Sequence, residues 1–282
     1  MNKLIAAWKL CRVHELLLAV PFAAVAVAYY PKPTDARLFA LTMLALCFGF
    51  MMGGAMNGIA DRKIDTHNTR TLSRPLAGGS LKLWQGVCVM GLCAAVTVLC
   101  TALIDPFYLL LLPIPALLCV LYCLSKRFTA CCHFLLGAVH SICPVAAGIV
   151  FGRLLHPATV LVTGVVFFSS VALDLLYSCL DVTADREQGL HSIPVRFGTG
   201  AAQALAGLLL AVATVLQAAI LTALAPHWSA WLSAGAAFAL VWWNFAAVRR
   251  GNTRAHGNIL GIYQLFSLLM LASAVFAYIW NV

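Results

Sequence analysis

Residues 37–65 read RLFALTMLALCFGFMMGGAMNGIADRKID, an apolar stretch long enough to cross a bilayer that ends in Asn57, Asp61 and Asp65. These three polar residues are spaced four apart. On a helix this spacing places side chains on one face, about 5–6 Å apart at Cβ for neighbouring pairs. The stretch therefore predicts a membrane helix with an oxygen-rich face at its end.

A second apolar stretch ends in the same way. Asp181 and Asp185 are again four apart, and Asp174 and Tyr177 precede them on the same stretch. The offsets of 7 and 11 from Asp174 return to nearly the same helical face. We expect the two motifs to form two acidic faces that oppose each other. Together they hold five of the 9 acidic residues.

The composition is typical of a polytopic membrane protein. Of all residues 63% are hydrophobic and 10% are charged, and the mean hydropathy is +0.95. Because a bilayer span needs about 20 mainly apolar residues, the chain is predicted to be all-α with nine transmembrane helices. The predicted spans are 14–30, 37–58, 82–103, 106–124, 130–151, 157–180, 201–223, 228–248 and 257–280.

The two motifs also indicate an internal repeat within one integral-membrane domain of residues 1–282. A shift of 124 residues superimposes Asn57 on Asp181 and Asp61 on Asp185. Each motif then lies at the end of an even-numbered span. This match predicts a pseudo-repeat of about 1–124 and 125–248, followed by a ninth helix.

Basic residues concentrate on one side of the predicted spans. With the N-terminus inside, the inside segments hold 15 of the 18 lysines and arginines, and only Lys32, Arg37 and Arg153 lie outside. Because basic loops stay cytoplasmic, the N-terminus and both motifs are predicted to face the cytoplasm, in a bacterial inner membrane. Topology and anionic membrane lipid account for the net charge of +9, so no nucleic-acid partner is expected.

The cysteines and histidines do not indicate a soft-metal site. The 11 cysteines lie almost entirely in apolar spans without zinc-ligand spacing, and are predicted to be small buried hydrophobic residues. His133 and His140 are predicted to be core residues that bond to a neighbouring helix.

The acidic motifs call for a functional explanation. An acidic side chain at membrane depth costs about 2.5–3.5 kcal/mol on insertion scales, so such residues usually face a cavity. Acidic residues can also lie at a helix end only to interact with water at the membrane surface. This alternative explains one or two acidic residues but explains two complete motifs poorly. A cation-coupled transporter that uses paired carboxylates stays open as an alternative.

The adjoining cations favour a phosphorylated substrate carried with magnesium. Mg²⁺ is usually held by one or two carboxylates together with substrate phosphates, and basic side chains bind the remaining phosphate oxygens. Tyr122 precedes Lys126 by one helical turn, which distinguishes this lysine from a topology anchor. The cations that follow the motifs or the fourth span are Lys63, Arg70, Arg74, Lys126, Arg127, Arg186 and Arg196.

These residues resemble the two signatures of the UbiA superfamily of intramembrane prenyltransferases. The first is Asn57-Gly-Ile-Ala-Asp61-Arg-Lys-Ile-Asp65 with Arg70-Thr71 and Ser73-Arg74-Pro75-Leu76. The second is Asp174-Leu-Leu-Tyr177 with Asp181-Val-Thr-Ala-Asp185-Arg186. Tyr122 to Lys126 is similar to the family's tyrosine-lysine motif. With the helix count, the resemblance covers nearly the whole chain.

The resemblance implies nine helices around a central cavity and a lateral opening for an isoprenyl tail. The loops at 59–81 and 186–200 are expected to cap the site as lids. The resemblance also implies the reaction: a polyprenyl group passes from a polyprenyl diphosphate to the ring of a carboxylated hydroxyaromatic acceptor. The acceptor would be 4-hydroxybenzoate or a dihydroxynaphthoate, in ubiquinone or menaquinone synthesis.

The resemblance further assigns roles to individual residues. Two Mg²⁺ ions would be held by the metal-binding set Asn57, Asp61, Asp65, Asp181 and Asp185. The diphosphate or the acceptor carboxylate would be bound by Arg12, Arg74, Tyr122 and Lys126. Asp174 would orient or deprotonate the acceptor hydroxyl, and Tyr177 would shield the carbocation through its ring.

One position departs from the family pattern. Many members have an aspartate directly after the motif's asparagine, where this chain has Gly58. The missing carboxylate is expected to weaken or rearrange one metal site. A substitution there also resembles the branch linked to the futalosine route to menaquinone.

Overall fold

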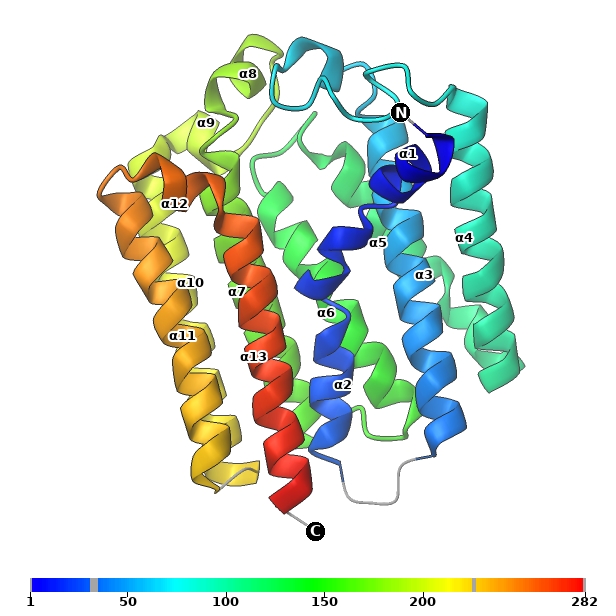
Figure 1. The fold of residues 1–282 in the computed structure, drawn as a ribbon, viewed down its shortest axis with the longest axis vertical. Coiled ribbons are helices and arrows are strands. Elements are labelled where there is room, and N and C mark those ends of the chain that lie inside the picture. Colours follow the sequence, from blue (N-terminus) through cyan, green and yellow to red (C-terminus); the bar gives the residue numbers. More distant parts are fainter. Residues whose placement is uncertain (1, 31–34, 225–226, 281–282) are drawn as a thin grey trace.

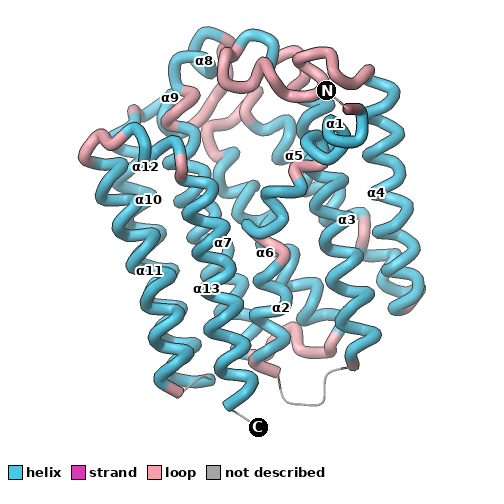
Figure 2. The backbone as a smooth tube through the Cα atoms, viewed as in Figure 1, coloured by secondary structure: helices cyan, strands magenta, loops and turns pink. Residues whose placement is uncertain are grey.

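A computed structural model describes residues 2–30, 35–224 and 227–280. In these ranges the chain is helical and contains no strand (Figures 1 and 2). Within the described residues, nine helical segments are long and apolar enough to cross a membrane, as predicted. The helices beyond the first span are α3 Ala36–Ala60, α4 Leu83–Ile104, α5 Pro113–Ser125, α6 Cys132–Val150, α7 Pro157–Ser178, α8 Val182–Glu187, α9 Ile193–Phe197, α10 Thr199–Leu224, α11 Trp228–Arg249, α12 Thr253–Gly257 and α13 Ile259–Trp280.

The first span is longer than predicted and is broken twice. It begins at Lys3 rather than at residue 14, and consists of α1 Lys3–Leu10, the 3₁₀ helix η1 Val13–Leu18 and α2 Pro21–Ala28. Arg12 separates α1 from η1 in a left-handed conformation (φ 50°, ψ 41°). Pro21 then starts α2, where its missing N–H costs no hydrogen bond.

The other spans follow the hydropathy pattern closely. Their ends lie within two residues of the predicted ones. The fourth span begins as the 3₁₀ helix η3 Pro106–Leu111 before α5, since Pro113 and Pro115 lie in the first turn of α5. With this composition and length, the chain is an integral membrane protein.

The core is formed by α7 and the helices packed around it. Val165, Val166, Leu175 and Leu176 of α7 are fully buried among α2, α6, α10 and α13. In Figure 1, α1, α8, α9 and the segment after α3 lie at one end of the bundle, whereas α13 ends at the other. Both acidic motifs therefore lie at the same end as α1.

Candidate active site

Each acidic motif crosses the end of a membrane helix. Asp61 is the C-cap of α3, and Asp65 lies in the next 3₁₀ helix, η2 Asp65–His67. The expected continuous helical face is therefore interrupted after Ala60. The i, i+4 spacing survives, because the Asp61 N–H donates to the Asn57 carbonyl (2.9 Å) and the Asp65 N–H to the Asp61 carbonyl (2.8 Å).

The second motif is interrupted in the same way. Helix α7 ends at Ser178, and Asp181 is the N-cap residue of α8. The Asp185 N–H still donates to the Asp181 carbonyl at 2.8 Å. Both motifs therefore combine a rigid membrane helix with a turn that directs carboxylates across its end.

The two motifs meet at one cavity of about 170 Å³. All eleven residues selected from the sequence line it: Arg12, Asn57, Asp61, Asp65, Arg74, Tyr122, Lys126, Asp174, Tyr177, Asp181 and Asp185. Its apolar wall includes Leu18, Phe50, Leu136, Val139 and Leu173. The cavity thus joins a charged region at the ends of the helices to an apolar region between them.

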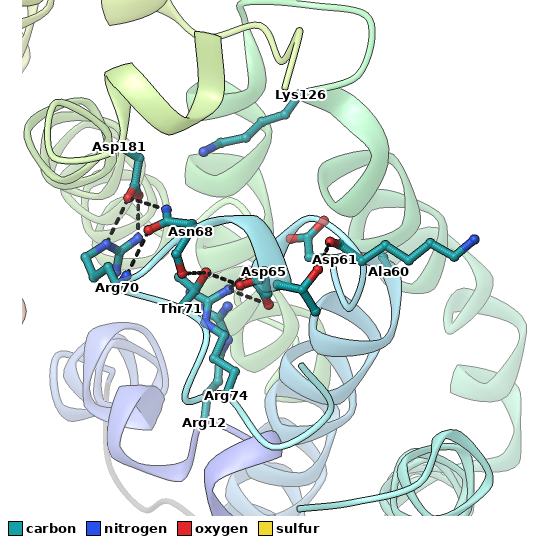
Figure 3. Close-up of polar contacts among 12 residues, drawn as sticks. Arg12, Ala60, Asp61, Asp65, Asn68, Arg70, Thr71, Arg74, Lys126 and Asp181 are labelled. Carbon is teal, nitrogen blue, oxygen red and sulfur yellow. Dashed lines mark hydrogen bonds and ion pairs between the residues drawn. The ribbon is translucent and has the colours of Figure 1, made fainter. Parts of the chain in front are cut away.

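Basic side chains pair with the carboxylates of the cavity (Figure 3). Arg74 Nη1 donates to Asp65 Oδ1 at 2.8 Å, and Arg70 Nε donates to Asp181 Oδ1 at 2.8 Å. Arg70 donates a second bond to Asp181 through Nη2. These charge-assisted bonds compensate two buried carboxylates.

Two further ion pairs come from the end of α5. Lys126 Nζ donates to Asp185 Oδ2 at 3.2 Å, and Arg127 Nη2 lies 3.8 Å from Asp61 Oδ1. Arg127 also donates to the Ala60 carbonyl at 2.8 Å, which fixes its side chain against the end of α3. The region between α5 and α6 thus supplies cations to both motifs.

Asn57 connects the first motif to the break in the first span. With its amide nitrogen turned toward Asp61, Asn57 donates to Asp61 Oδ2 (3.0 Å) and accepts from Arg12 Nη2 (2.7 Å). Arg12 also pairs with Glu15 at 3.2 Å. The left-handed backbone at Arg12 therefore directs a guanidinium into the cavity.

Asp174 and Tyr177 are also held by specific partners. His133 Nδ1 lies 2.6 Å from Asp174 Oδ2. Arg70 Nη1 donates to the Tyr177 hydroxyl, and the Arg70 guanidinium lies 4.8 Å from the centre of the Tyr177 ring. The face of this ring thus already accepts a cation.

Burial alters the acidity of the motif carboxyls outside the spans. Burial raises the pKa of Asp61, and the neighbouring Asp65 carboxylate adds to this effect. Burial also raises the pKa of Asp185, although the Lys126 ammonium opposes the shift. Both carboxyls therefore hold protons more tightly than exposed aspartates do.

The carboxylate and amide oxygens of the cavity suit a hard cation that is also coordinated by the substrate. Among the described residues, no three histidine, cysteine or acidic side chains converge as a preformed metal cluster. The four motif carboxylates instead line the cavity, each paired with a basic side chain. Mg²⁺ is commonly bound by one or two carboxylates together with substrate phosphates, so oxygen donors in this arrangement fit it.

Gly58 does not face this cavity. A Cβ at this position would lie 2.7 Å from Leu10 Cδ1, so the residue packs α3 against α1. Gly58 lines a second, adjacent cavity of about 290 Å³ between α1 and residues 73–77. Asp65 also lines this second cavity, so the expected effect of the missing carboxylate on a metal site stays a prediction.

Three polar residues of the site were given no individual role at the site from the sequence. Arg70 and Asn68 both donate to Asp181, and His133 bonds Asp174. Arg70 belongs to the first family signature, which was a usable signal. His133 bonds a neighbouring helix as predicted, but its spacing alone does not indicate that the partner is Asp174.

The predicted lid segments lie along the cavity. Ile64, Asn68 and Thr71 of the first segment line it, as do Gln188 and Leu190 of the second. His191 N–H donates to the Lys126 carbonyl at 2.6 Å, which fastens the second segment to the end of α5. Closure of these segments over a ligand stays a prediction.

Comparison with known proteins identifies the family. Residues 18–266 match the model of the UbiA prenyltransferase family. The chain is 32% identical over 185 residues to a 4-hydroxybenzoate octaprenyltransferase of Marinobacter nauticus, an alignment that covers 65% of this chain and 62% of that protein. The chain thus spans less than two thirds of the length of this relative.

Solved structures share the fold. The apo structure of a UbiA homolog from Aeropyrum pernix K1 superposes with a TM-score of 0.84 at 24% identity, over 93% of this chain and 98% of that one. A UbiA homolog from Archaeoglobus fulgidus bound to GPP and Mg²⁺ gives a TM-score of 0.69 at 17% identity, over 97% and 99%. By its matched residues and its fold, the chain belongs to the UbiA prenyltransferase family.

Proposed function

We propose that this protein transfers a polyprenyl group from a polyprenyl diphosphate to the ring of a carboxylated hydroxyaromatic acceptor, 4-hydroxybenzoate or a dihydroxynaphthoate. The observation that carries the proposal is a single cavity in which four motif aspartates and their cations adjoin an apolar region. Family membership and the Marinobacter relative's name support it. Nothing in these similarities supports the transporter alternative.

The polar region is suited to a diphosphate with two Mg²⁺ ions. Asp61 and Asp65 would hold one ion and Asp181 and Asp185 the other, and the amide oxygen of Asn57 would add a ligand if Arg12 released it. When bound, Mg²⁺ neutralises the charge that develops on the diphosphate as it leaves. The Archaeoglobus homolog, solved with GPP and Mg²⁺, supports binding of a divalent metal together with a prenyl diphosphate.

The cations that now pair with the carboxylates would bind the phosphate oxygens. Lys126 and Arg74 donate to Asp185 and Asp65, and their donor groups line the cavity. When a diphosphate enters, the same N–H groups can turn to its oxygens. Tyr122, one turn before Lys126, also lines the cavity and supports this subsite.

The reaction would proceed by ionisation and ring attack. The allylic C–O bond breaks, its electron pair leaves with the diphosphate, and the acceptor ring forms a C–C bond to the carbocation and then loses a proton. The apolar wall around Phe50 and Leu136 keeps water from the cation and accommodates the isoprenyl chain. The Tyr177 ring stabilises the cation, and Asp174 accepts the hydrogen bond or the proton of the acceptor hydroxyl.

We propose that this chemistry occurs at the cytoplasmic surface, and the distribution of cations supports this orientation. The described elements that hold most of the lysines and arginines lie at the same end as both motifs (Figure 1). By the positive-inside rule, this end and the N-terminus would face the cytoplasm, in what we propose to be a bacterial inner membrane. An anionic, water-soluble acceptor and a lipid-borne diphosphate would meet there.

The test uses membranes that contain the protein, a labelled polyprenyl diphosphate and each acceptor, with and without a chelator. We expect a prenylated acceptor that forms only with Mg²⁺. Asp61→Asn and Asp181→Asn should abolish turnover while the proteins stay folded in detergent. Absence of product with both acceptors would refute the proposed reaction, and full activity of both variants would refute the metal assignment.

A further inference from the structure

Helices α6 and α7 approach each other closely at Gly137. A Cβ at this position would lie 2.6 Å from Val171 Cγ2 and 3.0 Å from the Phe167 carbonyl oxygen. The glycine therefore allows two antiparallel helices to come near contact of their backbones. One turn before Gly137 on α6, His133 faces Asp174, which lies about one turn after Val171 on α7.

The hydrogen bonds of His133 determine its tautomer. The ring is fully buried, and the Ile193 N–H donates to Nε2 at 3.3 Å. Because a backbone N–H can only donate, Nε2 is an acceptor, and the neutral ring carries its proton on Nδ1. Nδ1 then donates to Asp174 Oδ2 at 2.6 Å, a charge-assisted bond.

This bond leaves the two oxygens of Asp174 unequal. Oδ2 is occupied by His133, whereas Oδ1 has no hydrogen-bond partner within residues 2–30, 35–224 and 227–280. Asp174 also lines the cavity. Oδ1 is therefore the oxygen that remains for a ligand hydroxyl, and the orientation of the carboxylate is set from behind by His133.

We infer that His133 is a positioning residue that holds Asp174 with Oδ1 available to the hydroxyl of the aromatic acceptor. This inference rests on the proposed function. It gives a buried residue of α6 a part in the reaction without contact with either substrate. The imidazole acts by fixing the rotamer of Asp174, and the Ile193 N–H at the start of α9 fixes the imidazole in turn.

The same stretch of chain links the two substrate subsites. His191 N–H donates to the Lys126 carbonyl at 2.6 Å, and two residues later Ile193 N–H donates to His133. Residues 191–193 thus connect the lysine proposed to bind diphosphate with the aspartate proposed to bind the acceptor.

Two substitutions separate the two bonds of His133. The amide of His133→Asn lies where Nδ1 lies and can still donate to Asp174, whereas the amide of His133→Gln lies where Nε2 lies and can still accept from Ile193. We expect His133→Asn to retain kcat within about threefold. His133→Gln should lower kcat about a hundredfold, the loss typical of a reacting group displaced by about 1 Å.

The Michaelis constant for polyprenyl diphosphate is the internal control. It should change less than about twofold in both variants, because His133 acts on the acceptor side only. If His133 serves only to anchor α9, His133→Gln should be the more active variant, and that order would overturn the inference. Equal kcat values accompanied by equal losses of thermal stability would overturn it as well.

A double variant tests whether the effect passes through Asp174. Once Asp174→Asn has removed the carboxylate, adding His133→Gln should lower kcat by less than about twofold. Independent effects that multiply would contradict the inference. All assays use membranes in which the wild type forms Mg²⁺-dependent product; a wild type without product refutes the proposed function instead.

Discussion

Helix α3 contacts the first span through two glycines one turn apart, and these respond differently to an added methyl group. A Cβ at Gly54 would lie 2.8 Å from the Cys11 carbonyl oxygen and 3.1 Å from its carbon. A Cβ at Gly58 would lie 2.7 Å from Leu10 Cδ1. The first neighbour is backbone at the break beside Arg12, and the second is the end of a flexible side chain.

The balance of two energies sets the expected size of each effect. Replacing a helical glycine by alanine stabilises by about 0.5–1 kcal/mol, because the unfolded chain loses freedom. Overpacking costs about 1–3 kcal/mol when the neighbour cannot move. Gly54→Ala should therefore destabilise by about 1–2 kcal/mol, or roughly 2–8 °C in Tm. Gly58→Ala should be near neutral, since Leu10 can rotate away.

Activity should distinguish the two variants more strongly than stability does. Gly54→Ala displaces Cys11 and with it Arg12, whose Nη2 donates to Asn57 at 2.7 Å. Misplacement of site groups by about 1 Å can cost about a hundredfold in rate. We expect kcat/KM to fall at least about tenfold in Gly54→Ala and less than about threefold in Gly58→Ala.

Both variants are measured side by side in one detergent, by thermal unfolding and by transfer of a labelled prenyl group. Equal losses in the two variants would refute the argument that the neighbour's freedom to move decides the outcome. A Gly54→Ala protein with wild-type Tm and rate would refute close packing of α3 on the break at Arg12.

Three further predictions concern the charges of the cavity. Arg70→Gln should raise the affinity for Mg²⁺ about tenfold, measured by calorimetry without substrate, and should lower kcat. The affinity rises because the ion no longer has to displace the hydrogen bonds from Arg70 to the charged Asp181, which are worth about 1.5 kcal/mol. An unchanged affinity would contradict this expectation. Because the pKa values of Asp61 and Asp185 are raised, these carboxyls take up protons at a higher pH than exposed aspartates do. As pH falls, the affinity for Mg²⁺ should therefore begin to decline at a higher pH than it would at a site of exposed aspartates. In the metal-free protein, the protonated carboxyls contribute to stability, and this contribution is lost as pH rises. Mg²⁺ and a non-hydrolysable polyprenyl diphosphate should each raise the other's affinity by the same factor, and independent binding would argue against a shared site.

Hydropathy and motif spacing predict the membrane spans and most of the residues that line the cavity, because both are local properties of the chain. Apolar runs of about 20 residues define the spans, and the fourfold spacing of Asp61 and Asp65 survives as helical turns after α3 ends. Helix α1 was missed because it has only eight residues and includes Lys3 and Lys9. The break between α1 and η1 depends on the left-handed backbone of Arg12, a conformation that the residue type does not predict.

The partners of the charged groups could not be predicted, because they depend on tertiary packing. Arg70 and Asp181 are 111 residues apart, and their pairing requires the segment after α3 to cross the end of α7. The bond between His133 and Asp174 requires a particular register of α6 on α7, which is set where Gly137 admits Val171. Spacing within one helix carries no information about that register.

The ion pairs explain how the cavity can hold four carboxylates before substrate arrives. Buried carboxylates without partners are strongly destabilising, and in this structure Arg70, Arg74 and Lys126 compensate three of them. Mg²⁺ alone would leave these cations without partners, and a diphosphate alone would leave the carboxylates without theirs. Under the proposed function, Mg²⁺ would take the place of the cation at each carboxylate and phosphate would take the place of the carboxylate at each cation, so every buried charge would stay paired. Under the proposed function, the family's acidic and basic motifs therefore act as one set whose members exchange partners.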